Sequence, residues 1–396
     1  MKRPIEIVAR RSRPLGMPAA TFLRDYWQRH PLLIRAAFPA FRDPLTPNDL
    51  AGLACEEAAL SRLVLHDARR DRWTLRNGPF AETDFAKLPT RDWTVLVQDV
   101  DKWDADVAAL LAHFMFLPSW RIDDVMVSYA VDGGSVGAHV DNYDVFLLQG
   151  QGRRRWQIST DPAANKQFRD DAELKLLREF MPTHEWTLEP GDMLYLPPGL
   201  PHHGVAIGEC LTYSIGMRAP SQADLMIDFV ETFAETLPEE LRLGDPDLSP
   251  SRGDGEIDDA AIRRVSKAMP WLRLDDASQL RPWIGSFLTR YRSAHTAAPR
   301  ARPITDSTFE RAFARSAWAM RNPWSRAAWM RDRRDANLFI AGTPHASSVP
   351  FARMLCSAAP IALAKVRSPR DRDVLRSLID AGHITLVEPT RTRSRR

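Results

Sequence analysis

The chain has 396 residues, of which 44% are hydrophobic and 27% are charged, and its formal net charge is +3. These values are ordinary for a soluble globular protein of two or three domains, and so small a net charge does not by itself indicate a nucleic-acid-binding protein. The cysteines Cys55, Cys210 and Cys356 lie far apart without a C-x-x-C pair, which favours a reducing compartment and argues against a structural zinc site.

The sequence shows no membrane span or signal peptide, which is consistent with a reducing compartment. No run of residues approaches the roughly 18 apolar positions of a membrane span, and the basic N-terminus lacks the apolar core of a signal peptide. We therefore expect a cytoplasmic protein that does not associate with membranes.

The N-terminal third mixes short strands and helices. Thr46 precedes Pro47 and Asp49 in the pattern of a capped helix start. Helices are also predicted over Ala19–Trp27 and Val107–Phe116. The predicted strands are Ile5–Val8, Pro31–Arg35, Leu60–Leu65, Asp71–Leu75, Trp93–Gln98 and Val125–Val131. This mixture predicts an α+β fold.

A glycine run, Gly133–Gly137, leads into a His-x-Asp pair, His139 and Asp141. In an extended strand residues i and i+2 point the same way, so the imidazole and the carboxylate share a face. Together they are two of the three ligands of a facial triad for non-haem Fe(II). A lone His-x-Asp pair often occurs by chance, so the prediction of a metal site depends on a third ligand. We expect that ligand to be a histidine on a neighbouring strand that is distant in the sequence.

A suitable segment lies about sixty residues further on. Glu189–Asp192 is a predicted turn, Met193–Leu196 a short apolar strand and Pro197–Gly199 a second turn. Either His202 or His203, just beyond, could supply the third ligand. Turn, strand, turn and histidine in this order is how a double-stranded β-helix, or jelly roll, presents a metal-binding histidine.

An arginine between these segments is predicted to point inward. Gln149–Gly152 predicts a hairpin-like turn, and Arg153–Ile158 a strand after it. Alternation places Arg154 on the same face as Trp156 and Ile158, inside the barrel. A buried arginine needs a buried anion, and a carboxylate fits a planar guanidinium best.

The chain then leaves the barrel. Asp161–Pro182 is predicted as an excursion that contains a helix over Glu173–Phe180. Cys210–Met217 is a late barrel strand, and Gln222–Leu237 is a long amphipathic helix that follows it.

Two segments with the composition of linkers, Gly244–Gly255 and Ser293–Pro303, enclose predicted helices over Ile257–Met269 and Ala277–Tyr291. Each helix has an apolar stripe, but so short a segment has little core of its own. We therefore expect it to pack on a second copy and form a homodimer.

The final segment alternates helix and strand. Strands over Ala336–Ala341 and Ile384–Val387, and helices over Ser348–Ala358 and Asp371–Asp380, suit a small winged-helix module. Gly382 is the predicted end of the second helix. The fold prediction is thus an α+β jelly roll over residues 1–221, a helical dimerisation segment over 222–300 and a winged-helix module over 301–396.

Five motifs together resemble a JmjC-type 2-oxoglutarate oxygenase, specifically the bacterial ribosomal oxygenases that hydroxylate an arginine of a ribosomal protein. They lie between roughly residues 120 and 220. The motifs are Gly137-x-His139-x-Asp141-Asn142-Tyr143-Asp144-Val145-Phe146, Gln149-Gly150-x-Gly152-Arg153-Arg154-Arg155-Trp156, Glu189-Pro190-Gly191-Asp192, Pro197-Pro198-Gly199-x-Pro201-His202 and Tyr213-Ser214-x-Gly216-x-Arg218-Ala219-Pro220.

The resemblance implies the roles of the site residues. His139, Asp141 and His202, rather than His203, would hold Fe(II) as the catalytic centre. Arg154 would bind the distal carboxylate of 2-oxoglutarate, which is consumed together with O2. The implied reaction hydroxylates the β-carbon of an arginine in a large-subunit ribosomal protein and releases succinate and CO2.

The sequence says less about the role of Asp132 and about the substrate. Asp132 begins an Asp-Gly-Gly turn, but the resemblance favours it as a residue that binds a cationic substrate side chain. A winged helix could suggest DNA binding, yet the net charge of +3 and the lack of a basic recognition stretch argue against it.

Three alternatives stay open. The chain could be a cupin-type metal enzyme that acts on a small molecule, although an inward Arg154 would then have no anion to bind. It could be a JmjC hydroxylase that acts on a histidine or on another protein. It could also be a non-catalytic interaction protein, although an intact ligand set argues against that.

Overall fold

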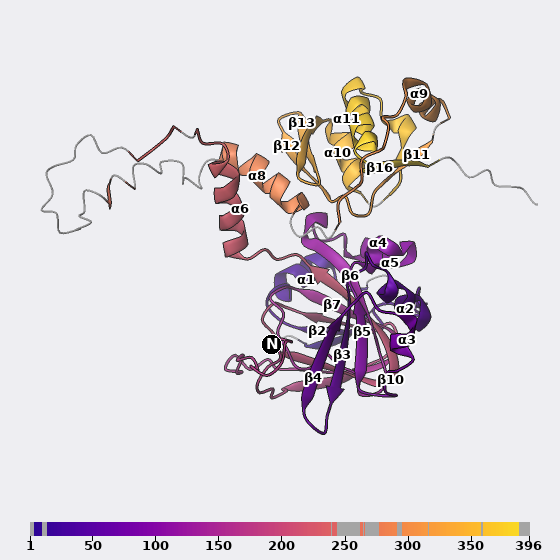
Figure 1. Cartoon of the computed structure of the whole chain (residues 1–396), viewed down its shortest axis with the longest axis vertical. Helices are drawn as coiled ribbons and strands as arrows, with labels where there is room; N and C mark the ends of the chain where they lie inside the picture. The colour runs from indigo at the N-terminus through magenta and orange to yellow at the C-terminus, as the bar shows by residue number, and fades with distance from the viewer. Residues whose placement is uncertain are drawn as a thin grey trace, which may run out of the picture. The chain divides into compact units, whose positions relative to one another are not determined.

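The computed structural model describes residues 4–9, 14–238, 240–243, 262–263, 265, 277–290, 295–315, 317–357 and 359–387 (Figure 1). The chain divides into two compact units, Met1–Ala219 and Pro220–Arg396, each described here by itself. The predicted linker Gly244–Gly255 lies outside the described residues, as does the predicted helix Ile257–Met269 apart from three positions. Within the described ranges, no helix is both long enough and apolar enough to cross a bilayer.

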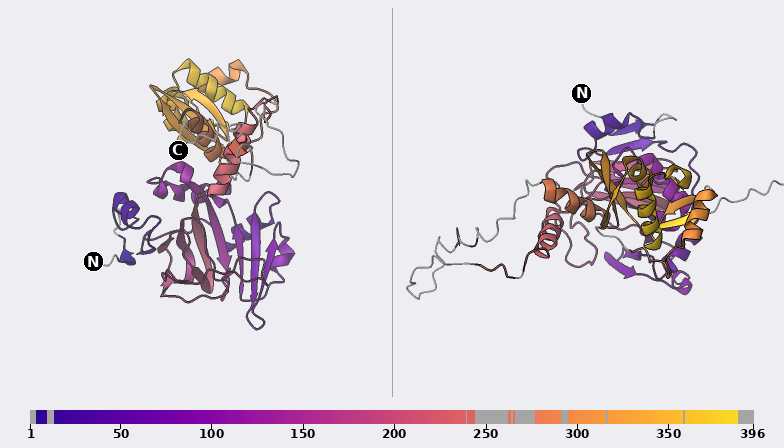
Figure 2. Two further views of the ribbon diagram at one scale, coloured as in Figure 1. Left: turned by 90° about the vertical axis from the view of Figure 1, so that its left-hand side faces the viewer. Right: turned by 90° about the horizontal axis from the view of Figure 1, so that it is seen from above.

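The first unit is built on one ten-stranded sheet, seen from further directions in Figure 2. Its helices are α1 (Ala19–Asp25), α2 (Pro47–Cys55), α3 (Glu82–Phe85), α4 (Val100–Trp103) and α5 (Ala105–Leu110), with 3-10 turns at Leu111–Phe114 and Ser119–Arg121. Its strands are β1 (Glu6–Val8), β2 (Leu32–Arg35), β3 (Ser61–Asp67), β4 (Arg72–Asn77), β5 (Trp93–Val97), β6 (Ile122–Ala130), β7 (Val145–Ile158), β8 (His184–Leu188), β9 (Met193–Leu196) and β10 (His202–Met217).

The sheet has the order β1-β2-β9-β7-β10-β6-β5-β3-β4, and β8 pairs with β7 beside this path. All pairs are antiparallel except β1 with β2. The long strands β7 and β10 pair from Val145 with Gly216 to Ile158 with His202. The predicted α+β jelly roll is confirmed for this unit.

The predicted turn at Gln149–Gly152 is wrong, because β7 continues through it as a bulge. The register with β10 shifts between Ile207 and Thr212. Gly152 has a φ of +64°, and a Cβ there would lie 2.0 Å from the Glu209 carbonyl oxygen, so only glycine fits. The bulge bends the strand pair without ending it, since Arg154 on β7 still pairs with Ala206 on β10.

The predicted helix over Glu173–Phe180 is also wrong. Leu176 and Leu177 are buried in an irregular segment, where the Leu177 N–H donates to Ala138 O at 2.8 Å. The Arg169 N–H donates to Leu176 O, also at 2.8 Å. These hydrogen bonds to distant residues replace the i to i−4 bonds of a helix and fix the excursion against the segment before His139.

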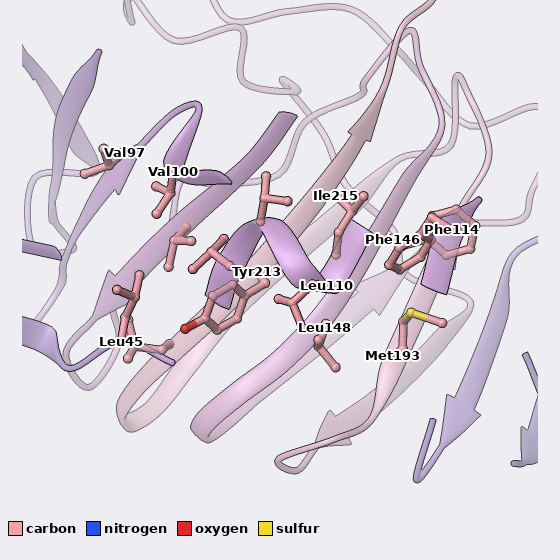
Figure 3. Packing of buried hydrophobic residues seen from close by; sticks show 14 of the residues in the cluster. Leu45, Val97, Val100, Leu110, Phe114, Phe146, Leu148, Met193, Tyr213 and Ile215 are labelled. Atoms are coloured by element: carbon pink, nitrogen blue, oxygen red, sulfur yellow. The ribbon is translucent and has the colours of Figure 1, made fainter. Parts of the chain in front are cut away.

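Aromatic side chains fill the core beneath the sheet. Phe146 on β7 is fully buried, and Figure 3 shows its ring beside that of Phe114, with the two centroids 5.0 Å apart. The ring centroid of Tyr195 lies 4.9 Å from that of Phe146. The neighbouring Asp144 carboxylate is also fully buried and accepts hydrogen bonds from Tyr195 Oη at 2.6 Å and Gln28 Nε2 at 3.0 Å. The N-terminal segment is thereby attached to the start of β7.

The second unit has two three-stranded sheets, ordered β15-β11-β16 and β12-β13-β14. Its helices are α6 (Gln222–Ala234), α8 (Ala277–Arg290), α9 (Asp306–Ala314), α10 (Val349–Cys356) and α11 (Pro369–Asp380). Its strands are β11 (Trp318–Arg321), β12 (Ala327–Asp332), β13 (Asp335–Ile340), β14 (Thr343–Ser347), β15 (Ile361–Ala362) and β16 (Ile384–Val387).

Helix α8 packs on two partners within this unit. Trp283 and Phe287 form an aromatic cluster with Phe229 of α6. On its other side, the Thr289 hydroxyl accepts a hydrogen bond from Gly342 N at 2.9 Å, and Gly285 lies too close to Phe339 for a Cβ. Helix α8 therefore packs with the C-terminal strands as well as with α6, and the predicted division at residue 300 stays a prediction.

Replacing Phe146 should destabilise the first unit strongly. We expect Phe146→Ala to lower the free energy of unfolding by ~3–5 kcal/mol, because it leaves a cavity among buried rings. Phe168→Ala, at a side chain that is 41% exposed, should change it by less than about 0.5 kcal/mol. Denaturant unfolding followed by tryptophan fluorescence measures both, and equal effects would contradict the described core.

Candidate metal centre and cosubstrate site

Two backbone hydrogen bonds bring the ligand segments together. His139 N donates to His202 O, and His202 N donates to His139 O, both at 3.0 Å. This isolated antiparallel bridge joins the segment after the glycine run to the first residue of β10. The two imidazole centroids lie 4.1 Å apart as a result.

The ligand atoms of His139, Asp141 and His202 converge. Asp141 Oδ2 lies 3.7 Å from His139 Nε2 and 3.6 Å from His202 Nε2, and the three ligand atoms all lie within 4.8 Å of one another. No other such cluster of potential ligands occurs in the part of the chain that is described.

Backbone carbonyls fix both imidazoles in the form that binds a metal. His139 Nδ1 lies 3.0 Å from Gly137 O, and His202 Nδ1 lies 2.9 Å from Leu200 O. Donation from each Nδ1–H leaves a lone pair on Nε2, which is the atom facing Asp141. Burial lowers the pKa of His202, so its imidazole is neutral at pH 7.

His203 points away from this cluster. Its Nε2 lies 3.1 Å from the hydroxyl of the buried Ser135, and its ring packs edge-on against Phe180. Burial lowers the pKa of His203 to about 4. The structure therefore brings His202, and not His203, to the other two candidate ligands.

Arg154 lies inside the barrel, as the alternation predicts. It is 6% exposed, and among the described residues its Nε and Nη2 have no hydrogen-bond partner. Its Nη1 lies 3.4 Å from the Ser128 hydroxyl, and its guanidinium carbon lies 5.8 Å from the centroid of Trp156. The neighbouring Arg153 and Arg155 are exposed.

Ser128 is a functional candidate that the sequence interpretation missed. It lies on β6, is 3% exposed and offers a hydroxyl beside the Arg154 guanidinium. Alternation along Val125–Val131 could have placed it inside the barrel, but a single serine on a strand carries no signal that distinguishes it from a core residue.

Asp132 is not one of the clustered ligands and lies in the turn after β6. Its carboxylate accepts a hydrogen bond from Gly208 N at 3.0 Å and lies 3.0 Å from Arg91 Nη2. The side chain is 51% exposed, so this ion pair contributes little to stability and can be exchanged for another cation.

These residues fit the groups that the motifs imply. Two imidazole nitrogens and one carboxylate oxygen are the donor set of a non-haem Fe(II) site with open positions. A buried guanidinium with two unsatisfied nitrogens fits a carboxylate bound in bidentate fashion. The candidate site therefore has places for both a metal and a dicarboxylic cosubstrate.

Comparison with known proteins identifies both units. A JmjC domain family matches residues 109–225, and a ROXA-like winged helix family matches residues 273–385. The ribosomal protein uL16 3-hydroxylase of Escherichia coli is 36% identical over 282 residues, which cover 71% of this chain and 74% of that protein. A probable ribosomal oxygenase of Haemophilus influenzae is 40% identical over 234 residues, covering 59% of this chain and 55% of that protein.

Solved structures agree with these relationships. The crystal structure of E. coli YcfD matches with a TM-score of 0.82 and 31% identity, covering 94% of this chain and 99% of that chain. A structure of the same ribosomal oxygenase in complex with cobalt and 2-oxoglutarate matches with a TM-score of 0.78 and 31% identity, at the same coverage. The predicted jelly roll and winged helix are thereby confirmed.

Removing the carboxylate ligand should abolish metal-dependent turnover. We expect Asp141→Ala to lose iron-dependent consumption of 2-oxoglutarate while its circular dichroism spectrum stays that of the wild type. His202→Ala should weaken Mn²⁺ binding, measured by calorimetry, far more than His203→Ala, because only His202 faces Asp141. The reverse order of the two histidines would contradict the ligand assignment.

Removing the inward arginine should weaken cosubstrate binding. We expect Arg154→Ala to raise the KM for 2-oxoglutarate by about 100-fold, because a charge-assisted bidentate pair in a shielded site is lost. Arg153→Ala and Arg155→Ala are the matched controls and should change it by less than about threefold. Similar effects of all three substitutions would show that the face assignment is wrong.

Proposed function

The chain belongs to the JmjC-type ribosomal oxygenases, and from this membership we propose that it hydroxylates the β-carbon of an arginine in a protein of the large ribosomal subunit. It is an Fe(II)- and 2-oxoglutarate-dependent oxygenase. The observation that carries the assignment of its site is the buried Arg154 guanidinium, which needs an anion, in the same barrel as the convergent His139, Asp141 and His202.

The reaction follows from what each side chain can do. His139, Asp141 and His202 hold Fe(II), which when bound supplies the activation of O2 that couples decarboxylation of 2-oxoglutarate to hydroxylation of a C–H bond. Arg154 binds the distal carboxylate and so orients the keto acid end toward the metal ligands. One oxygen atom of O2 enters succinate, and the other becomes the new hydroxyl group.

The surrounding residues keep the site shielded and fixed. Trp156 and Ile158 extend the apolar face that carries Arg154, which excludes water and strengthens the pairing with a carboxylate. The Ser128 hydroxyl is placed to share the cosubstrate carboxylate with Arg154.

We assign recognition of the substrate side chain to Asp132. The half-exposed Asp132 carboxylate would exchange its pair with Arg91 for the guanidinium of the substrate arginine. The E. coli relative is a hydroxylase of the ribosomal protein uL16, which supports a ribosomal protein as the substrate here. A ribosomal substrate also supports a cytoplasmic location.

Mass spectrometry of ribosomal proteins tests the proposal. Cells that carry the gene should contain one large-subunit protein heavier by one oxygen atom, with the oxygen on the β-carbon of an arginine. Cells without the gene, and cells that carry Asp141→Ala, should lack it. An added oxygen on a histidine would show that the hydroxylated residue is histidine and not arginine. No difference between the strains would contradict a ribosomal substrate.

We further propose a homodimer through the helical segment that contains α6. Met226 and Ile227 on this helix are 67% and 57% exposed in the single chain, and pairing two copies would bury them. Light scattering should give twice the chain mass of 44.9 kDa. Ile227→Glu should shift the protein toward the monomer, whereas Glu231→Lys, also exposed on α6, should not; a wild-type monomer at micromolar concentration would remove this proposal.

A further inference from the structure

Positive charge is concentrated in the C-terminal part of the chain. Residues 295–387 contain fifteen lysines and arginines against seven aspartates and glutamates, an excess of eight positive charges. Residues 1–219 contain twenty-six against twenty-nine, an excess of three negative charges. The small net charge of the whole chain therefore conceals regions of opposite sign, and the basic region is expected to attract a polyanion.

Five of these fifteen basic residues gather around the hairpin formed by β12 and β13, where Arg281 of α8 joins them. Three arginines belong to the hairpin, and α8, α10 and α11 each contribute one more. Asp332 and Asp335 are the hairpin's two carboxylates, and Asp371 of α11 follows Arg370, so positive charge exceeds negative charge by three at this place. The arginines of this hairpin cluster are Arg281, Arg331, Arg333, Arg334, Arg353 and Arg370.

Contacts tie the cluster together. Arg281 of α8 donates to the Arg331 carbonyl, and Arg370 of α11 pairs with Asp335 at 3.0 Å. Arg333 lies at the hairpin tip with a φ of +52°, a conformation that glycine or asparagine adopts at lower cost. The demands of the turn therefore do not explain an arginine at this position.

Trp329 orients two of the guanidinium groups. The guanidinium carbon of Arg331 lies 5.9 Å from the centroid of this ring, and that of Arg353 lies 5.6 Å from it. Stacking on an aromatic face restrains a guanidinium while its N–H edges stay available for hydrogen bonds. Both side chains are exposed, so these edges are accessible to an anion.

Two arginines of α11 in the same unit are neutralised by acidic residues of α9. Arg372 pairs with Glu310 at 2.6 Å, and Arg376 pairs with Asp306 at 2.5 Å. By contrast, Arg331, Arg333, Arg334 and Arg353 form no ion pair with any described residue. The hairpin cluster thus has four arginines without an ion pair and a net positive charge, whereas Arg372 and Arg376 are paired with residues of α9.

We propose that the hairpin cluster binds RNA, and specifically the ribosomal RNA that surrounds the substrate protein; this rests on the proposed function. Ribosomal proteins are themselves basic, so a positive surface would repel such a protein and attract the phosphates beside it. Guanidinium groups stacked on an aromatic ring match the geometry of phosphate oxygens. The catalytic unit, which has an excess of negative charge, binds the substrate protein, and the hairpin cluster binds the RNA.

Binding of a labelled RNA hairpin of about 20 base pairs to the full-length protein tests this inference. At about 100 mM salt, R333E/R334E should raise the Kd at least tenfold, and the dependence of affinity on salt should become less steep. The matched control is R302E/R311E, which makes the same charge change at exposed residues, one of them on α9; Figure 1 shows α9 across the unit from β12 and β13. The control should change the Kd by less than about threefold. R353E, on α10, is a second variant outside the turn, and it should also raise the Kd for the RNA hairpin.

Several results would overturn the inference. They are equal losses in the two double variants, no binding by the wild type, or tighter binding of a DNA duplex or of polyglutamate than of RNA. Hydroxylation of a short ribosomal peptide, measured in parallel, should be the same in R333E/R334E and the wild type. A protein that binds RNA through the cluster but hydroxylates no ribosomal peptide would contradict the proposed function and leave RNA binding supported.

Discussion

The pairing of β7 with β10 is the interaction on which the site depends. It sets Ile158 opposite His202 and Arg154 opposite Ala206, so one strand pair fixes both a candidate metal ligand and the candidate cosubstrate anchor. The short bridge from His202 to His139 then brings in the other two candidate ligands. A one-residue slip of this register would turn Arg154 out of the barrel, because side chains alternate between faces.

This arrangement buries the charged Arg154 guanidinium, and removing that charge from water costs free energy of folding. A buried guanidinium without a carboxylate destabilises a fold by several kcal/mol. The same low-dielectric surroundings make a carboxylate cosubstrate bind more strongly than it would at the surface. If Arg154 is the anchor, as we propose, the cost of burying its charge is the counterpart of stronger cosubstrate binding.

Local patterns predicted most of the candidate site. The His-x-Asp pair, the second turn and the alternation around Arg154 each reflect geometry that spans only a few residues. The bulge at Gly152 was missed because a glycine that bends a paired strand and a glycine that ends one look alike in sequence. The helix predicted over Glu173–Phe180 was wrong because Leu176 and Leu177 form backbone hydrogen bonds with Arg169 and Ala138. The hairpin cluster was missed because its arginines come from three helices and a hairpin, and only the tertiary structure brings them together.

The most direct test of the central claim, that Arg154 holds the distal carboxylate, removes that carboxylate from the ligand. Calorimetry with Mn²⁺ present would compare 2-oxoglutarate with 2-oxobutanoate, which keeps the keto acid but lacks the distal carboxylate, in the wild type and in Arg154→Ala. The account predicts a preference of about 100-fold for 2-oxoglutarate in the wild type and of less than about threefold in the variant, since the two changes remove the same interaction. A variant that keeps the full preference would show that another group holds the carboxylate.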